Sequence, residues 1–367
     1  MLISVCIPQY NRSRYLLVVL ESVRLQDHPE VEVIISDDSS SDDTSEIIPH
    51  FITSVEGKTH IRFKYIRQPK NLGYDGNLRA ALAAAHGEYL FVLGNDDALP
   101  EKDTLSKLAA ILTRLNYPDI AFTNYHLAGK PNDVQRRARS TTVIGSGPDV
   151  AVKNFRAFSF VGGLVIKRTA FNEHNTDQYD GSVYVQIYLA ARTIAAGGTV
   201  AAISESLVAK DVRFPGEEID SYLDTLVRNN RRLHRELGGL DQVGRVGCEA
   251  ILPYVPLVSR QRYILKIYAQ LLLLTYPYWL LNYRENGVYR AAVNLALGCF
   301  PPNLIRTSNV SLLVYLCLIV LYVGSTAVGL LVPVKLLRRV AKWALYFSKR
   351  QSRHGRILKA GVELPAS

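Results

Sequence analysis

Asp96 and Asp97 are adjacent carboxylates that directly follow a short apolar run, residues 89–93. Carboxylate oxygens are the ligands that Mg²⁺ and Mn²⁺ prefer in proteins. The pair is therefore a candidate site for a divalent cation. The alternative explanation is structural, because aspartate is also favoured as the N-cap of a helix and a helix could begin after Pro100.

The segments around this pair alternate between strand and helix patterns. Runs of β-branched and apolar residues are typical of buried strands, and apolar positions at helical spacing follow each run. Such alternation with short connections predicts an α/β fold with a doubly wound, mostly parallel sheet. The expected strands are 2–8, 31–36, 61–66, 89–93 and 158–166, and the expected helices are 14–26, 44–51 and 77–86. We expect a mobile surface loop at 129–148, and a close backbone approach at Gly162 and Gly163.

Polar loops follow four of the expected strands. Ligands of such sheets bind beyond the carboxyl ends of the strands, so polar loops gathered there are the main functional signal in the sequence. The loops are residues 9–12, 37–43, 69–77 and 95–97.

Within residues 1–214 the chain resembles family 2 glycosyltransferases of the GT-A fold. Four motifs occur in order: ISVCIPQYNR at 3–12, SDDSSSDDT at 36–44, NLGYDGN at 71–77 and GNDD at 94–97. The last two look most like bacterial surface-polysaccharide transferases. The family usually has Asp-x-Asp at the fourth motif, whereas Gly94 or Asn95 stands at its first position in this chain. One carboxylate is therefore missing, which leaves open whether Asp96 or Asp97 contacts the metal.

The resemblance implies a nucleotide-diphosphate sugar as donor and Mg²⁺ or Mn²⁺ as cofactor. A cation held by Asp96 and Asp97 would stabilise the charge that develops on the leaving diphosphate. Asp38 would accept a hydrogen bond from the base, and Tyr10 offers a ring for stacking. Asn77 could instead cap the helix that follows it. The other residues implied in donor binding are Pro8, Asn11, Gly73 and Asp75.

An inverting transfer needs a general base that takes the proton of the acceptor hydroxyl. Relatives place this carboxylate after the Gly162–Gly163 strand, which corresponds to residues 173–181. We expect Asp180 to be the base, with Asp177 and Glu173 as the next candidates. The alternative role of Asp180 is the N-cap of a helix expected at residue 183. Further along, Lys210 and Arg213 could bind a phosphate or form a solvated charge cluster.

The positive charge lies in the C-terminal part of the chain. Residues 1–220 contain 23 Lys and Arg against 27 Asp and Glu, a net of −4, whereas residues 221–367 contain 20 against 6, a net of +14. The sum is the overall +10. An acidic front and a basic, apolar rear argue for a soluble domain followed by a membrane-facing region, and against nucleic-acid binding. The four scattered cysteines favour a reducing compartment.

Residues 307–334 contain no charged side chain, and about 20 apolar residues suffice to cross a bilayer. The basic tail that follows is expected on the cytoplasmic side, and so is the N-terminal domain, for which we expect no signal peptide. An even number of crossings would satisfy both, either with 263–281 as a second span or with a fold-back at Gly324 and Ser325. An in-plane arrangement is the third alternative, and a buried hairpin of a soluble protein is the fourth.

These patterns predict four regions: a GT-A domain at 1–220, a helical membrane-proximal region at 221–306, a transmembrane or re-entrant segment at 307–334 and a basic amphipathic tail at 335–367. The tail is expected to contain a surface helix at 334–348. The predicted function is inverting sugar transfer from a nucleotide-diphosphate donor to a lipid-linked saccharide, as in O-antigen or capsule synthesis, at the cytoplasmic side of the inner membrane.

Three other functions compete with this prediction. The acceptor could be a polyprenyl phosphate itself, or the chain could be a non-catalytic membrane scaffold with a degenerate transferase domain. A sugar nucleotidyltransferase is disfavoured because the first loop has no glycine-rich segment to bind a triphosphate. The expected partners are the donor, the lipid-linked acceptor and membrane lipids.

Overall fold

The computed structural model describes residues 1–214, 227–307, 309–336 and 338–339. The chain divides into two compact units. The first contains Met1–Gly181 and Arg192–Arg213, and the second contains Ser182–Ala191 and the described residues from Phe214 onward. Each unit is described by itself below.

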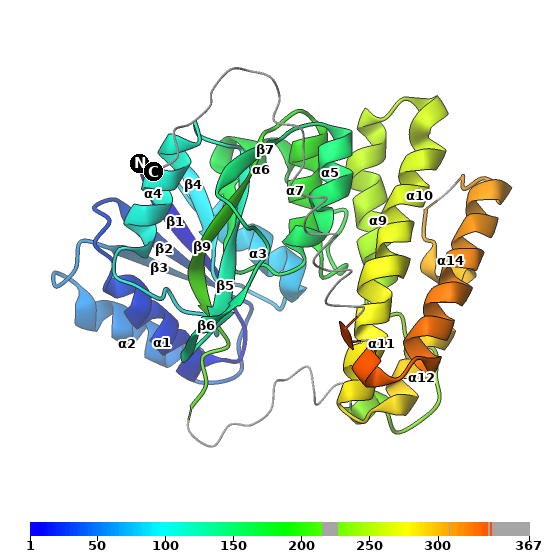
Figure 1. Cartoon of the computed structure of the whole chain (residues 1–367). Coiled ribbons are helices and arrows are strands. Elements are labelled where there is room, and N and C mark those ends of the chain that lie inside the picture. The colour runs from blue at the N-terminus through cyan, green and yellow to red at the C-terminus, as the bar shows by residue number, and fades with distance from the viewer. Residues whose placement is uncertain (215–226, 308, 337, 340–367) are drawn as a thin grey trace. The chain divides into compact units, whose positions relative to one another are not determined.

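The first unit is built on one mixed sheet with the strand order β3-β2-β1-β4-β8-β5-β9-β7, with β6 paired to β5 (Figure 1). Parallel pairing joins β1 to β2 and β4, β2 to β3, and β5 to β9. Antiparallel pairing of β8 with β4 and β5 separates the two parallel groups. The strands are β1 (Ile3–Gln9), β2 (Val31–Asp37), β3 (Arg62–Arg67), β4 (Tyr89–Val92), β5 (Ile120–Leu127), β6 (Lys130–Gln135), β7 (Thr142–Gly145), β8 (Leu164–Lys167) and β9 (Val200–Lys210).

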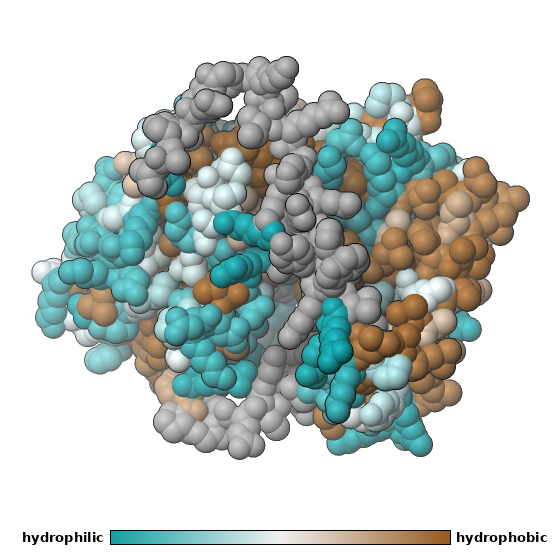
Figure 2. Space-filling view, viewed as in Figure 1, coloured by the Kyte–Doolittle hydropathy of each residue, from teal (hydrophilic) through white to brown (hydrophobic). Residues whose placement is uncertain are grey.

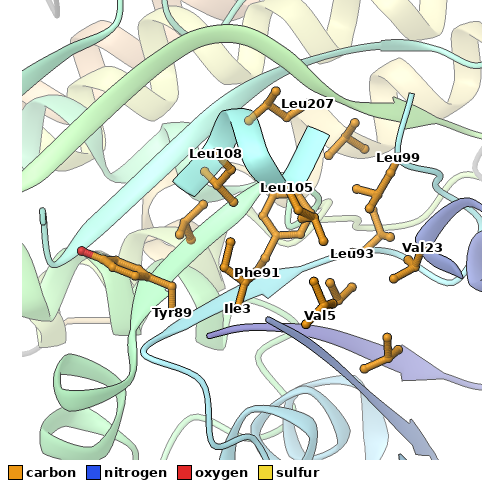
Figure 3. Close-up of a cluster of buried hydrophobic side chains, with 14 of the residues drawn as sticks. Ile3, Val5, Val23, Tyr89, Phe91, Leu93, Leu99, Leu105, Leu108 and Leu207 are labelled. Atoms are coloured by element: carbon orange, nitrogen blue, oxygen red, sulfur yellow. The ribbon is translucent and has the colours of Figure 1, made fainter. Parts of the chain in front are cut away.

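Helices cover both faces of this sheet, as expected for a doubly wound α/β fold (Figure 1). On one face, α1 and α4 pack on alternate side chains of β1 and β4, and Leu105 and Leu108 of α4 lie close to Phe91 (Figure 3). On the other face, α3 contacts β1 and β2. The predicted fold class is therefore confirmed. The helices of this part are α1 (Ser13–Arg24), α2 (Thr44–Val55), α3 (Gly73–Ala83), α4 (Thr104–Arg114), α5 (Pro148–Asn154), η1 (Phe155–Phe158), α6 (Arg168–His174) and α7 (Val185–Ala195).

Three expectations about local structure in this unit are wrong. Residues 129–148 are not one surface loop, because β6 and β7 form within them and join the sheet. Only the end of the expected strand 158–166 is extended, since η1 occupies residues 155–158. The third helix begins at Gly73 rather than at Asn77, so half of the expected loop 69–77 is helical.

The second unit is helical. Beyond α7 its elements are α9 (Leu240–Ile251), η2 (Leu252–Tyr254), η3 (Leu257–Ser259), α10 (Arg260–Gln270), the π-helical η4 (Leu271–Thr275), α11 (Tyr276–Glu285), α12 (Tyr289–Gly298), α13 (Pro301–Leu304) and α14 (Leu312–Leu331). Two stretches are long and apolar enough to cross a membrane by length and composition alone: Leu257–Glu285, and α14 itself.

These two stretches run side by side in the same direction. Gln261 contacts Asn309 and Ser311 at their starts, and Tyr276 Oη lies 2.8 Å from Thr326 Oγ1 midway. At their ends Arg284 donates to the carbonyl oxygens of Gly329 and Val332. Consecutive crossings of a bilayer run in opposite directions. These two helices therefore cannot be the two crossings of the expected two-span arrangement unless residues 286–308 also cross.

Helix α14 is continuous through Gly324 and Ser325. The alternative that residues 307–334 fold back at this position is therefore wrong. At about 1.5 Å per residue, its 20 residues are about 30 Å long, which matches the hydrocarbon core of a bilayer. Ten of the fifteen residues of the predicted surface helix at 334–348, namely 337 and 340–348, lie outside the described residues.

The burial pattern of α14 is unusual for a helix in water. Its buried side includes Ser325 and Gly329, whereas large apolar side chains such as Val320, which is 71% exposed, point outward. A broad hydrophobic surface covers this helix in Figure 2. Small residues at helix contacts and large apolar residues outside are typical of helices whose solvent is lipid. The exposed apolar residues of α14 are Leu312, Leu313, Leu316, Val320, Val323, Val328 and Leu331.

Candidate active site

Gln9, the last residue of β1, joins the loops at the carboxyl edge of the sheet. Its backbone oxygen accepts from Asp38 N at 2.9 Å and from Asn77 Nδ2 at 3.1 Å. Its side-chain oxygen accepts from Asn95 Nδ2 at 2.8 Å, and its side-chain nitrogen donates to Thr44. Three of the four expected polar loops, and the start of α2, are thus held at one buried residue.

Asp38 is almost completely buried, and its carboxylate accepts from Leu72 N at 2.5 Å. Burial raises the pKa of this carboxyl group, although hydrogen bonds from Leu72 and Gly73 oppose the shift. Asp38 thereby satisfies backbone donors at the start of α3. The sequence predicts that Asp38 accepts a hydrogen bond from the nucleotide base. In the structure Asp38 also accepts a hydrogen bond from the backbone at the start of α3.

Asn77 lies inside α3, on its fifth residue, so the alternative that it caps the helix is wrong. Its side chain is buried, and Oδ1 has no hydrogen-bond partner within the described part of the chain. An unpaired buried acceptor costs about 1–3 kcal/mol, and such groups call for an explanation in a native structure. In this chain the unpaired atom lies beside Gln9, among the residues predicted to bind the donor.

The first loop presents one aromatic side chain and fixes the second loop. Tyr10 is nearly half exposed, as a stacking residue needs to be, and Pro8 pairs with Ser36 in the sheet. Asn11 adopts a positive φ of 49°, and its Oδ1 accepts from Ser41 N at 2.7 Å. Positive φ at residues other than glycine is strained and recurs at functional sites. Ser39 and Asp211, also near this edge, share this conformation.

Asp96 follows β4, and its partly exposed carboxylate forms an ion pair with Arg12 of the first loop. Burial raises the pKa of Asp96, whereas the Arg12 guanidinium opposes that shift. The backbone of Asp96 also accepts from Val212 N at 2.7 Å. Asp96 therefore connects the first loop, the end of β4 and the segment after β9.

The side chain of Asp97 is buried, whereas that of Asp96 is partly exposed to solvent. A Cβ atom at Gly94 would lie 2.7 Å from Asp97 Oδ2, and one at Gly162 would lie 2.5 Å from the same atom. The expected close backbone approach at Gly162 is therefore confirmed. Burial, and then the neighbouring Asp96, raise the pKa of Asp97 to about 7. Because Asp97 Oδ2 fills the space beside residue 94, glycine rather than a carboxylate stands at the first position of the motif.

Neither aspartate caps a helix, since α4 begins at Thr104 with Asp103 at its N-cap position. Among the described residues, no three His, Cys, Asp or Glu side chains are grouped to hold a metal ion. One or two carboxylates suffice for Mg²⁺ when substrate phosphates and waters complete its shell. The partly exposed Asp96 fits this requirement, and the enclosed Asp97 fits it less well.

Asp180 and Asp177 lie in the turn before α7, and α7 begins only at Val185. The alternative of Asp180 as its N-cap is therefore wrong. Asp180 accepts from Arg79 Nε at 2.8 Å and from Arg79 Nη2 at 2.6 Å, a bidentate pair. Asp180, and then Asp177 and Asp75, raise the pKa of Arg79. One guanidinium of α3 thus contacts Asp180 and lies within electrostatic range of Asp177 and Asp75, two other predicted site residues.

Helix α3 links the two predicted halves of the site. Asn77 contacts Gln9 on the donor side, and Arg79, two residues later, contacts Asp180 on the acceptor side. Glu173 is exposed on α6, with its carboxylate 3.9 Å from His174 Nε2. Lys210 pairs with Asp211 at 2.8 Å.

Arg137 is a partly buried residue that the sequence did not single out. Its guanidinium donates to carbonyl oxygens of Thr123, Phe160 and Gly162, and it lies over the rings of Tyr125 and Phe160. Burial lowers its pKa to about 10. Arg137 fixes the segment that contains Gly162 and so encloses Asp97. The sequence also gave no role in the site to Arg12, Arg79 or Gln9. The residues that these side chains contact lie far from them in the sequence, so no local pattern marks them.

Comparison with known proteins agrees with this geometry. Residues 4–174 match the Glycosyl transferase family 2 model, so the chain contains a family 2 glycosyltransferase domain. The crystal structure of S. aureus TarS 1–349 in complex with UDP superimposes with a TM-score of 0.56 at 15% identity and covers 90% of each chain. The fold is therefore that of GT-A glycosyltransferases.

Two curated relatives are bacterial sugar transferases by name. The abequosyltransferase RfbV of Salmonella typhimurium is 40% identical over 114 residues, which are 30% of this chain and 33% of RfbV. The GalNAc(5)-diNAcBac-PP-undecaprenol beta-1,3-glucosyltransferase of Campylobacter jejuni is 36% identical over 98 residues, 26% of this chain and 30% of that enzyme. The matches thus span about a third of these relatives.

Proposed function

We propose that this chain is a membrane-associated inverting glycosyltransferase that moves a sugar from a nucleotide-diphosphate donor to a lipid-linked saccharide. The observation that carries the proposal is the position of α3 in a family 2 domain. It holds predicted donor residues at Gln9 through Asn77, and the predicted base Asp180 through Arg79. A transferase needs both sets within reach of one sugar.

On the donor side, Tyr10 would stack on the base, and Asp38 would accept from a base or ribose donor. The unpaired Oδ1 of Asn77 would accept a ribose hydroxyl. Asp96 would hold Mg²⁺ or Mn²⁺, which when bound supplies positive charge to the leaving diphosphate. Arg12, paired with Asp96 in this structure, would turn its guanidinium to a diphosphate oxygen, for which its fork of donors is suited.

On the acceptor side, Asp180 would take the proton of the attacking hydroxyl. The bidentate bond to Arg79 places the carboxylate but occupies its oxygens, so the base must release one of them as the acceptor binds. Arg79 would then remain a positioning residue, which holds the Asp180 side chain next to α3.

The acceptor class rests on the second unit and on the relatives. The relative in Campylobacter carries a PP-undecaprenol acceptor in its name, and both relatives fit surface-polysaccharide synthesis. Helix α14 exposes an apolar surface that lipid would cover. The basic character of residues 221–367 favours the cytoplasmic leaflet of the inner membrane for this unit.

The test is a panel of UDP-, GDP-, CDP- and dTDP-sugars, scored by thermal stabilisation and by sugar release with and without Mn²⁺. We expect one donor to stabilise the protein and to be turned over. Asp180→Asn should keep donor binding and lose transfer by about 10²–10⁴-fold, the usual contribution of a general base. If no donor is turned over by the wild-type chain, the non-catalytic scaffold replaces this proposal. An equal loss in Asp177→Asn alone would move the base to Asp177.

A further inference from the structure

A small pocket of about 330 Å³ lies in the second unit, outside the site described above. Its volume falls at the lower end of the roughly 300–1,000 Å³ that is usual for ligand pockets. Two of its lining residues are arginines, and no carboxylate is among them. The lining residues are Asn230, Arg231, Gly287, Tyr289 and Arg290.

The two arginines have no acidic partner among the described residues. Across the described part of the chain, no ion pair involves Arg231 or Arg290. The nearby Glu285 is paired with Arg338 at 2.6 Å, so its charge is already compensated. Two guanidinium groups at one pocket, with no carboxylate of the described residues beside them, form a candidate anion-binding site. Arginine suits phosphate because its guanidinium can bind two oxygens at once.

The walls of this pocket are fixed to each other. Asn230 Oδ1 accepts from Arg290 N at 2.9 Å and from Ala291 N at 3.3 Å, so backbone donors at the start of α12 are already satisfied. The completely buried Asn294 donates to the carbonyl oxygens of Asn229 and Arg232. The backbone that carries the two arginines is therefore already ordered, which lowers the entropic cost of binding an anion.

The pocket lies where the apolar helices end. Gly287 follows α11 after two residues, and Arg284 of α11 donates to the last carbonyl oxygens of α14 (Figure 1). Tyr289 is exposed beside the arginines, and Leu331 is exposed at the end of α14. An apolar surface that ends in tyrosine and arginine is the usual composition of a membrane–water boundary.

We propose that Arg231 and Arg290 bind the phosphate or diphosphate of a membrane lipid, in the first place that of the lipid-linked acceptor. This inference rests on the proposed function for the identity of the lipid. The pocket would hold the lipid phosphate at the boundary, while the lipid chain lies along the apolar surface of α14. The soluble donor carries the same phosphate chemistry, so the experiment must separate the two sources.

The test compares two double variants of the full-length chain that remove the same charge. Arg231→Gln/Arg290→Gln changes the pocket, and Arg232→Gln/Arg262→Gln changes two arginines that do not line it. Binding is measured to phosphatidylcholine vesicles with and without polyprenyl phosphate, and to vesicles with phosphatidylglycerol. The melting temperature of each variant is compared with wild type; all four side chains are exposed, so none is expected to unfold the chain.

We expect the pocket variant to bind polyprenyl-phosphate vesicles about 25-fold more weakly, because each of its two arginines contributes about fivefold near an anionic surface, and we expect the control to lose only a few-fold. Arg231→Lys/Arg290→Lys should recover part of the binding. Equal losses in both Gln variants would overturn the proposal, because diffuse surface charge would then explain them.

Inorganic diphosphate in solution is the second probe. If it stabilises the wild-type chain only with both pocket arginines, while polyprenyl-phosphate vesicles bind the wild-type chain and the pocket variant equally, the site serves a soluble phosphate and the lipid assignment is overturned. The proposed function fails in a different readout, namely absence of donor turnover by the wild-type chain. The two failures are therefore distinguishable.

Discussion

The two units of this chain arrange the same residue types in opposite ways. In the first unit, the large apolar side chains of β1, β4 and α4 meet in a buried core, and polar loops lie at the edge of the sheet. In the second unit, α14 buries Val314 and Leu318 together with the small residues Ser325 and Gly329, and it exposes most of its other leucines and valines. The first arrangement is the usual one for a domain in water, and the second supports the proposed contact of α14 with lipid.

The comparison also assigns different tasks to the two units. Charged side chains in the first unit are held by partners that are distant in the sequence, as Asp96 is by Arg12 and Asp180 by Arg79. In the second unit, Arg231 and Arg290 form no ion pair with any described residue. We interpret the former as a preorganised site for chemistry and the latter as a site for an incoming anion.

The largest expected effect separates chemistry from membrane binding. Asp96→Ala should lower sugar transfer by about 10²–10³-fold or more, because charge stabilisation at the leaving group is lost, and should leave vesicle binding unchanged. Asp133→Ala, on exposed β6, is the control. Initial rates with the stabilising donor measure the change, and a variant that transfers at the wild-type rate would remove Asp96 from the site.

The second prediction compares one exposed valine from each unit. Val320→Asp on α14 should weaken membrane association by about 100-fold, since a carboxylate in hydrocarbon costs about 2.5–3.5 kcal/mol. Val143→Asp on β7, which is 40% exposed, should have no such effect. Sedimentation with vesicles measures both. Equal behaviour of the two variants would mean that both units face the same solvent.

The third prediction concerns the support of the site. Arg137→Gln should destabilise the first unit by about 2–4 kcal/mol, because buried carbonyl oxygens lose a charged donor. Arg136→Gln, at an exposed neighbouring position, is its control. Urea unfolding measures the difference. A cost no larger than that of Arg136→Gln would show that the guanidinium does not hold this segment.

The smallest expected effect is a pH dependence within the first unit. Burial opposes ionisation of Glu32, but hydrogen bonds from Ser4, His86 and Gly87 outweigh it and hold its pKa below the usual value. A lowered folded-state pKa stabilises above the unfolded pKa of about 4.3, and this stability is lost as the pH falls through the folded value. Glu32→Gln should cost about 1–2 kcal/mol at neutral pH and reduce the acid-side slope of stability. An unchanged slope in urea titrations between neutral and acid pH would contradict it.

Local patterns in the sequence predicted the strands that carry the site. Residues 31–36 and 89–93 are short, apolar and flanked by polar turns, so β2 and β4 were predictable without tertiary information. The start of α3 was not, because Gly73 and Gly76 favour a loop and the donors there are satisfied by Asp38, from another strand.

Residues joined by tertiary contacts escaped prediction for the same reason. Gln9 holds groups that lie 29 to 86 positions away, and no local pattern encodes such contacts. Arg137 stands in a polar segment that is typical of surface loops, yet its guanidinium is partly buried and donates to carbonyl oxygens of distant residues. The parallel course of α11 and α14 likewise depends on contacts between Tyr276 and Thr326, 50 residues apart.

The central claim is that the first unit transfers a sugar to an acceptor that the second unit meets in the membrane. The direct measurement is the fate of a labelled sugar when the full chain is incubated with its donor and with vesicles that contain lipid-linked saccharide. We predict that the label enters the lipid fraction with wild type and fails to do so with Asp96→Ala. Label that appears only in water, or on a soluble acceptor at the same rate without vesicles, would contradict the claim.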